Sequence, residues 1–590
     1  MAQEDIDKEN PRFLQAKSME KGGLYKEAEN ILISLNTEKP ESSTYFAALK
    51  SMLKNKSDYD NLLKYSILHS DSRNNDLISE LEVLESLILL DRKNEWLDMT
   101  HKLSKKHIND KESTILIINR LISLQKIDAG KKIIYNFRIE NNDKYFYSLQ
   151  LSNFLNMSMS YEESALELIL YLDYQPSKIN YISNRFMSFP NNKDINTKIE
   201  KILITSNVQG CQKILADLYL KQKKYTESYA ILKNLDNSSY IFDFAADIVI
   251  VEEYALAVEV LKNLISSSKN QNIIREAIFE ISKIVEVQSL QTNMESLSIS
   301  NFHSGSPIFN SEFISIDESK AKDLNYSLSI YDSLGINNNI EAMLRLADLR
   351  YLVLGDLDGA MNTYKKIISK SRKNSQKFSS LNKITDIYIS KGNLNQAQIS
   401  VDNSKKNYLL NNQKIELGLK EIQINFYKSN FSESKNIAQN LLIDTPIGHH
   451  RYNDILSFLQ VIILFDNHEA ALKSFSEAQL KLKQNKRIEA IRILEEIRDV
   501  DDTIVMDLIK YQIAFLWYLQ GEYIKSLDVA RQLDSATIYS ELALILMAEV
   551  NEIAIRDIAR AIELYLDFLS QYPTSIFYDE IRIHIRELAS

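Results

Sequence analysis

Residues 20–40, EKGGLYKEAENILISLNTEKP, contain the pattern that decides the fold of this chain. Two glycines precede Tyr25, Ala28 follows three residues later, and Pro40 comes fifteen residues after the tyrosine. Glycine permits the left-handed conformation with which many helices end, and proline cannot continue a helix. The stretch therefore predicts the turn and the second helix of a helical hairpin.

The same pattern recurs along the whole chain, with several successive spacings of 34, 35 or 37 residues. Each unit has an aromatic or bulky marker inside an amphipathic stretch. The markers are Tyr25, Tyr59, Trp96, Ile127, Tyr161, Tyr225, Tyr254, Leu357, Leu394, Phe431, His468, Arg487, Tyr523 and Ile558. We therefore predict about fourteen to sixteen tandem helical hairpins.

Small residues stand at two fixed places relative to the markers. Two helices can approach to roughly 8–10 Å only where a small side chain faces the partner helix. Three residues after the marker lie Ala28, Gly130, Ser164, Ser228, Ala257, Ala360, Ala397, Ser434, Ala471, Ala490, Ser526 and Ala561, with Leu62 and Met99 as exceptions. Nine residues before it lie Ala16, Ser152, Ala216, Ala245 and Ala514. We therefore expect small side chains on both helices of a hairpin at the place where the two helices contact each other.

The motifs GGLYKEA, GDLDGA, GNLNQA, GEYIKS and IARAIELYLDFLSQYP resemble the tetratricopeptide repeat family. Proline also recurs fifteen residues after the marker at Pro40, Pro176, Pro446 and Pro573, as in that family. The resemblance covers most of the chain. It implies an all-α, right-handed α-solenoid of tandem TPR-like hairpins that binds protein partners along a concave groove.

Two regions depart from the pattern. Residues 177–208 should form a hairpin pair but lack the marker and the small residue. Residues 286–322 are rich in Ser and Asn and predict a loop-rich insertion or linker. We therefore expect an N-terminal superhelix over 1–285, with degenerate repeats, and a C-terminal superhelix with a terminal capping helix over 323–590.

Charge and motifs exclude several function classes. The formal charge of -10 is interspersed, and without a basic cluster we expect no nucleic-acid partner. No run of about 20 apolar residues predicts a membrane span. No phosphate-binding, nucleophile-elbow or zinc motif occurs, so we expect neither cofactor nor metal. Cys211 is interpreted as a small buried hydrophobe, and His449 and His450 as solvated loop residues.

The start of the chain bears on location. It has neither a basic region nor an apolar stretch of the kind that signal peptides carry. Ala2-Gln3-Glu4 resembles the junction left after cleavage in many bacterial envelope proteins, and the ending YP-x-S resembles repeats of envelope assembly proteins. A periplasmic or envelope location is therefore expected, with a cytoplasmic location as the alternative.

Candidate partner-binding residues lie on the first helices of C-terminal hairpins. Tyr511, Phe515 and Tyr518 share one helical stripe, distinct from the side of Ala514. Packing against the adjacent repeat is the alternative interpretation of these aromatics. Equivalent places in two other hairpins hold Gln423 and Phe426, and Asn382 and Asp386.

The sequence therefore predicts a non-catalytic scaffold that binds a partner protein or peptide in a concave groove. A structural subunit of a bacterial envelope assembly complex is one alternative. The regulatory part of an enzyme, with catalytic residues hidden in 286–322, is another, although Asp317 and Glu318 lack a base or nucleophile partner.

Overall fold

The computed structural model describes residues 7–235, 237–290, 308–309, 313–314, 316, 318–408, 410–498, 500–533 and 537–588. Throughout these ranges the regular secondary structure is helical, without a strand, which confirms the all-α repeat fold. Contacts divide the chain into two compact units, residues 1–244 (unit 1) and 245–590 (unit 2). Each unit is described by itself.

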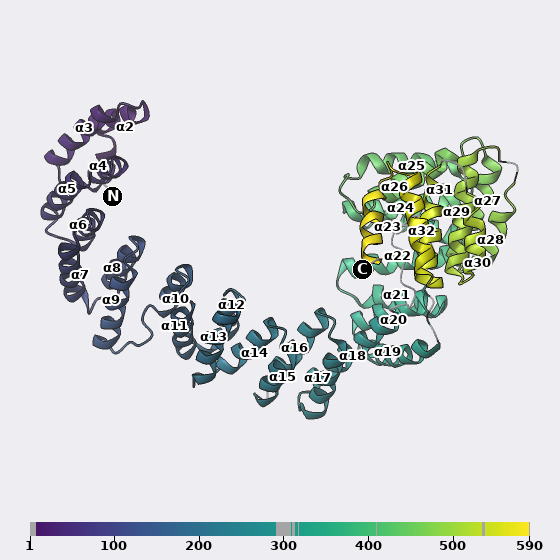
Figure 1. Ribbon diagram of the computed structural model, residues 1–590, viewed down its shortest axis with the longest axis horizontal. Helices are drawn as coiled ribbons and strands as arrows, with labels where there is room; N and C mark the ends of the chain where they lie inside the picture. The colour runs from purple at the N-terminus through teal and green to yellow at the C-terminus, as the bar shows by residue number, and fades with distance from the viewer. Residues whose placement is uncertain are drawn as a thin grey trace. The chain divides into compact units, whose positions relative to one another are not determined.

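Unit 1 is a succession of helical hairpins, each packed on the next (Figure 1). Its helices are α2 (Pro11–Lys21), α3 (Tyr25–Glu38), α4 (Ser43–Asn55), α5 (Tyr59–Ser72), α6 (Leu77–Leu89), α7 (Lys93–His107), α8 (Lys111–Ser123), α9 (Ile127–Glu140), α10 (Ser148–Met157), α11 (Tyr161–Tyr174), η1 (Pro176–Lys178), α12 (Ile179–Met187), α13 (Lys193–Thr205), α14 (Cys211–Lys221) and α15 (Tyr225–Asn234). The irregular region 177–208 thus forms α12 and α13. The division between the units falls inside α16 (Ser238–Ile250).

Unit 2 is also built of helical hairpins. Its helices are α17 (Tyr254–Ser267), α18 (Gln271–Leu290), α19 (Glu318–Ile336), α20 (Ile340–Leu352), α21 (Leu357–Lys370), α22 (Asn374–Ser390), α23 (Leu394–Lys405), α24 (Asn411–Tyr427), α25 (Phe431–Asp444), α26 (Tyr452–Leu464), α27 (Glu469–Lys483), α28 (Arg487–Glu495), α29 (Thr503–Leu519), α30 (Tyr523–Ala530), α31 (Ile538–Glu549), η2 (Val550–Ile555), α32 (Ile558–Gln571) and α33 (Tyr578–Leu588). Helix α27 contacts α24 of the preceding hairpin and also α22 of the hairpin before that, so it joins hairpins that are not successive.

Twelve of the fourteen predicted markers coincide with the starts of second helices, whereas Trp96 lies inside α7 and His468 directly precedes α27. The marker is the first residue of α3, α5, α9, α11, α15, α17, α21, α23, α25, α28, α30 and α32. The small positions meet as expected, because the Ser164 hydroxyl donates to the Ser152 carbonyl and the Ser228 hydroxyl to the Ala216 carbonyl, both at 2.8 Å. The two small positions of a hairpin therefore face each other.

Helix ends follow the predicted stop signals. Helices α3, α11, α25 and α32 each end two residues before a proline. Gly23 has φ +79° in the first turn, a conformation that costs glycine little. Ser57, Lys223 and Ser429 adopt the same left-handed conformation in other hairpin turns. Glycine is therefore favoured at this place but is not required.

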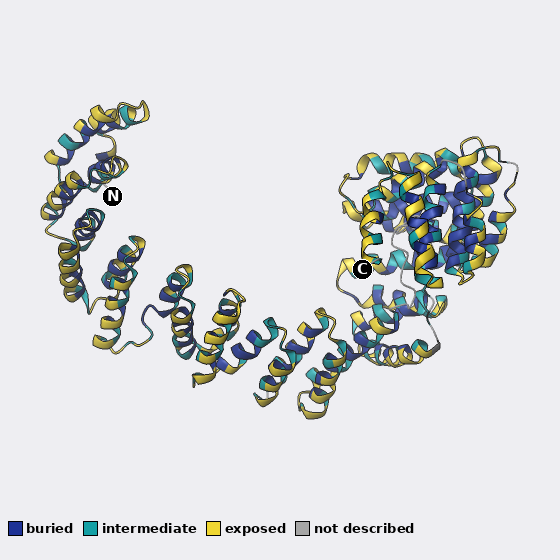
Figure 2. Ribbon diagram, in the orientation of Figure 1, coloured by how far each residue is buried: buried dark blue, intermediate teal, exposed yellow. Residues whose placement is uncertain are grey.

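The cores of the two units differ in extent. Unit 1 has separate clusters, one in α2–α5, one in α5–α10 and one in α11–α15. In unit 2 one large cluster joins residues from α22 to η2. Figure 2 shows the buried residues of unit 2 concentrated around α24–α31, whereas buried and exposed stripes alternate in unit 1.

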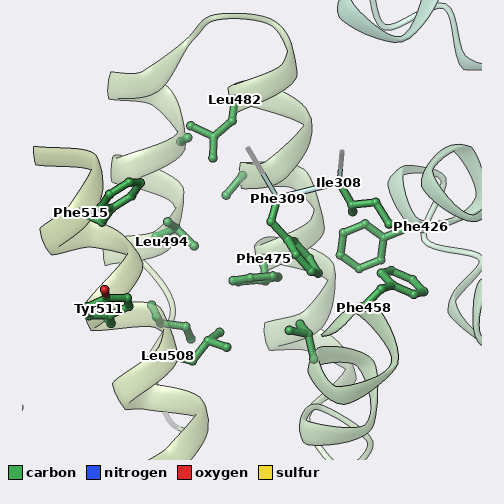
Figure 3. Close-up of a cluster of buried hydrophobic side chains, with 14 of the residues drawn as sticks. Ile308, Phe309, Phe426, Phe458, Phe475, Leu482, Leu494, Leu508, Tyr511 and Phe515 are labelled. Atoms are coloured by element: carbon green, nitrogen blue, oxygen red, sulfur yellow. The ribbon is translucent and has the colours of Figure 1, made fainter. Parts of the chain in front are cut away.

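Some residues of the region 286–322 are part of the core of unit 2. Helix α18 reaches Leu290 and α19 begins at Glu318, so both ends of the region are helical. Ile308 and Phe309 lie in the large cluster of unit 2 (Figure 3). Residues 291–307 fall outside the described residues. The assignment of 286–322 as a linker between two superhelices stays a prediction.

Candidate partner-binding pocket

The first helices of three successive hairpins in unit 2 enclose a pocket of about 250 Å³. Its residues come from α22, from α24 and from the residue that precedes α26. They are Phe378, Ser379, Asn382, Lys383, Asp386, Glu416, Leu419, Lys420, Gln423 and Arg451. On α22 and α24 they recur every three or four residues, so each helix presents one face to the pocket.

A buried ion pair forms one wall of the pocket. The Lys420 ammonium donates to a carboxylate oxygen of Asp386, and each side chain is only 8% exposed. Removing one partner of such a pair leaves the other charge buried without compensation. The pair therefore ties α22 to α24 at the pocket.

A second ion pair stands at the opening between α24 and α26. The Arg451 guanidinium donates to Glu416 at 2.9 Å and to Asp454 at 3.0 Å. Burial opposes the charge, but the two carboxylates outweigh it and raise the pKa of Arg451. Lys383 is nearby, with its ammonium nitrogen 5.6 Å from the centroid of the Tyr351 ring. The pocket thus presents both cationic and anionic groups.

A hydrogen-bonded path connects the pocket to the core of unit 2. The Gln423 amide donates to the Tyr427 hydroxyl at 3.2 Å, and this hydroxyl donates to the Ile308 carbonyl at 2.8 Å. Gln423 lines the pocket, whereas Ile308 is a buried core residue. One helical turn of α24 therefore faces both the pocket and the core.

The structure brings together part of the predicted site. Asn382, Asp386 and Gln423 all line the pocket. Phe426 does not; its ring packs edge to face against Phe309 and Phe458 in the core.

The aromatic stripe of α29 is also remote from solvent. Tyr511, Phe515 and Tyr518 are all buried in the large cluster of unit 2. Helices α28, α30 and α31 pack against α29 and cover its faces. This arrangement agrees with the alternative interpretation, in which the stripe packs against neighbouring repeats. The binding role of these aromatics stays a prediction, without exposed surface in this structure to support it.

Sequence reasoning missed the charged residues of the pocket, namely Lys383, Glu416, Lys420 and Arg451. Charged residues at helical spacing usually indicate a solvent-exposed face of a helix, so this pattern alone does not predict a binding pocket. A signal did exist, because Asp386 and Lys420 are 34 residues apart and Glu416 and Arg451 are 35 apart. Opposite charges one repeat apart on first helices thus indicate contacts between hairpins.

Other candidate chemistry finds little support in the structure. Burial raises the pKa of the Cys211 thiol, which disfavours a thiolate nucleophile. Among the described residues no cluster of His, Cys, Asp and Glu could hold a metal ion. The described part of the chain also contains no helix with the length and apolarity needed to cross a membrane.

Comparisons with known proteins support the repeat assignment. The tetratricopeptide repeat family model matches residues 341–373, which contain most of α20 and all of α21. No curated protein matches the sequence. A solved structure titled "Structure of Naa15/Naa10 bound to HypK-THB" is 10% identical and has a TM-score of 0.24, covering 98% of this chain and 96% of that chain. That TM-score is too low for an argument about function.

The family match spans one hairpin, and it coincides with two of the predicted motif positions, Leu357 and Ala360. The resemblance to tetratricopeptide repeats is therefore supported. The comparisons do not support the finer resemblance to bacterial envelope proteins, nor a periplasmic location.

Proposed function

We propose that this chain is a protein–protein interaction scaffold, without catalytic activity of its own, that binds a partner protein or peptide in a concave groove of unit 2. The pocket between α22, α24 and α26 is the observation that carries this proposal. It is hollow, it lies on first helices, and three residues selected from the sequence line it. Tandem hairpins commonly form an extended concave binding surface.

The chemistry of the pocket favours a polar side chain of the partner. Asn382 offers an amide that can both donate and accept, and Lys383 offers a cation. Asp386 and Lys420 already neutralise each other, as do Glu416 and Arg451. The pocket thus presents both cationic and anionic groups, and a neutral amide side chain, which can both donate and accept, finds complementary groups there.

The test is a pair of matched tryptophan substitutions. Asn382→Trp fills the pocket, whereas Asn395→Trp adds the same bulk to the exposed surface of α23. A partner captured with the unaltered chain from its native cell is then titrated against each variant. We expect Asn382→Trp to weaken binding at least tenfold and Asn395→Trp to leave it unchanged.

Thermal unfolding separates lost binding from lost structure. If both variants unfold as the unaltered chain does and both bind the partner equally well, the pocket is not the binding site. If binding is lost only where the fold is lost, the pocket again has no support as the binding site.

A further inference from the structure

The first helices of unit 1 share a polar surface on the inner side of its curved row of hairpins (Figure 1). This inner surface consists of Lys50 and Lys54 of α4, Glu82 and Glu85 of α6, Arg120 of α8, Asn153 of α10 and Arg185 of α12. The hydrogen bonds among these side chains join residues that are 31 to 38 apart in the chain, which is about one repeat. Successive first helices thus place polar groups at equivalent positions.

Around α4, α6 and α8 the inner surface carries more cations than anions. Both lysines of α4 and Arg120 of α8 donate to Glu85. Lys50 and Arg120 also donate to Glu82. The carboxylate lies deeper than its partners, because the side chain of Glu85 is 6% exposed, whereas those of Arg120 and Lys54 are 24% and 39% exposed. A ligand that approaches from solvent therefore meets the cations first.

Arg185 adds a further cation to the inner surface. Its guanidinium donates to the side-chain oxygen of Asn153, and among the described residues it pairs with no carboxylate. The Nε atom of Arg185 also has no hydrogen-bond partner in the described part of the chain. Asp217 of the next first helix, α14, pairs with Lys213 instead. Because a guanidinium can hold a carboxylate through two parallel hydrogen bonds, Arg185 is suited to bind one.

We propose that the inner surface binds an extended, acidic segment of a partner protein, whose carboxylates pair with Lys54, Arg120 and Arg185. Between the last two, α10 contributes the neutral amides of Gln150 and Asn153, which can bind the backbone of such a segment. Packed helices lie roughly 8–10 Å apart, so the four steps from α4 to α12 cover about 30–40 Å. About a dozen extended residues span this distance, at roughly 3.3 Å per residue.

The charge of the whole chain makes such binding specific. The formal net charge is -10, so general electrostatic attraction favours cationic ligands over acidic ones. An acidic segment is therefore attracted only where cations are in local excess. Nucleic acid fits the inner surface less well, because its closely spaced phosphates call for clustered cations, whereas carboxylates and amides separate the cations here.

The test is a titration of the full chain with a fluorescent peptide of six glutamate–serine pairs, whose two ends are blocked. A peptide of six lysine–serine pairs is the control ligand. We expect the glutamate peptide to bind more tightly, and its affinity to fall as sodium chloride is added, because salt screens exposed charges. Lys54→Gln with Arg185→Gln should weaken its binding at least tenfold. Lys102→Gln with Lys105→Gln removes the same charge from the exposed side of α7 and should leave the binding unchanged.

A single variant covers the case in which the double variant does not fold. Lys54→Gln leaves Glu85 with two other cations, and we expect it to bind the glutamate peptide about threefold more weakly than the unaltered chain. Equal binding by all chains, no binding at all, or tighter binding of the lysine peptide would overturn the proposal. So would an unfolded double variant together with no loss for Lys54→Gln. Tighter binding of a single-stranded oligothymidylate than of the glutamate peptide would also overturn it, and would make the inner surface a nucleic-acid site.

This inference goes beyond the proposed function, and its outcomes are separable from it. The inner surface belongs to unit 1 and the pocket to unit 2, so Asn382→Trp should bind the glutamate peptide as the unaltered chain does. Failure of the peptide titration with success of the pocket test leaves the scaffold in place. The charged residues of the inner surface would then serve only as contacts between hairpins.

Discussion

In unit 1 the first helices α4, α6 and α8 are joined by charged side chains, whereas in unit 2 helices α24, α26 and α27 are joined by aromatic rings around Phe309. Lys50 and Lys54 of α4 each donate to Glu85 of α6 at 2.7 Å. Arg120 of α8 donates to the same carboxylate and to Glu82. The same hairpin therefore supports two kinds of contact between repeats.

The difference between the contacts of the two units indicates which contacts make unfolding cooperative. The contacts in unit 1 run from each hairpin to the next, and its apolar clusters are separate. In such an array stability is approximately a sum of repeat and nearest-neighbour terms. In unit 2 the contact of α27 with α22 joins repeats that are not neighbours. We therefore expect unit 2 to unfold more cooperatively than unit 1.

The two tryptophans allow each unit to be followed by itself. Trp96 begins the buried face of α7 in unit 1, and Trp517 lies on α29 in unit 2. Chains with Trp517→Phe or Trp96→Phe leave one fluorescent reporter each. Each prediction below is tested by urea unfolding, which is followed by tryptophan fluorescence in these two single-tryptophan chains.

The largest effect is expected for Phe426→Ala. Phe426 is fully buried and its ring contacts Phe309, Phe458 and Phe431. Truncation of a buried phenylalanine typically costs about 3–5 kcal/mol, because transfer energy is lost and a cavity remains. We expect this loss in the Trp517 signal and none in the Trp96 signal. A cost below about 1 kcal/mol would show that the aromatic rings around Phe309 do not hold unit 2 together.

The next effect concerns the charged contacts of unit 1. Burial alone would raise the pKa of Glu85, but hydrogen bonds from Lys50 and Lys54 lower it from 4.5 to about 2. Because the folded-state pKa is the lower one, the stabilisation is present above pH 4.5 and is lost as the pH falls towards 2. Glu85→Gln should cost roughly 1.5–3 kcal/mol at pH 7, the range for hydrogen bonds to charged groups.

The measurement is the Trp96 unfolding curve at pH 7, 5 and 3. The difference between the unaltered chain and Glu85→Gln should shrink at pH 3. Glu95→Gln, on the exposed side of α7, serves as the control and should stay within about 0.5 kcal/mol. A difference that is constant with pH would mean that the Glu85 charge contributes nothing.

A similar or smaller effect is expected in both units from the close contact inside each hairpin. Ala28 and Ala561 are both fully buried, and each lies three residues after the marker of its hairpin. Leucine at either place should cost about 1–3 kcal/mol, because overpacking forces the helices apart. Ala47→Leu, on the exposed side of α4, should change little. Unequal costs in the two units would mean that the hairpin is not the shared element.

Much of this fold could be predicted because its signals are local. The marker and the small residue lie within one helical turn, and Tyr25, Tyr161 and Ile558 each begin a helix as expected. The contact of Ile308 with Tyr427 spans 119 residues and has no periodicity to announce it. Helical periodicity likewise predicts the face on which Tyr511 lies, but it does not indicate which helices cover that face.

The candidate site could also be predicted only in part. Asn382, Asp386 and Gln423 were found because they occupy equivalent places on first helices. Lys420 and Arg451 could be found only by pairing charges one repeat apart, which requires that the repeat register be known first. Residues that pair between repeats can therefore be predicted from the sequence only once the repeat register is known.

The smallest net effect is expected for a neutral contact in unit 2. The amides of Gln479 and Gln512, both buried, donate to each other at 2.8 and 2.9 Å and join α27 to α29. Gln479→Leu leaves the amide of Gln512 without this partner, which should cost about 1–3 kcal/mol in the Trp517 signal. Adding Gln512→Leu removes the unsatisfied amide, and the double variant should return to within about 1 kcal/mol of the unaltered chain. Such recovery would sharpen the contrast with unit 1, where one carboxylate accepts from three cations and the contact depends on pH. A double variant that is less stable than the single one would instead show that the amide pair is needed to position α27 across the repeats.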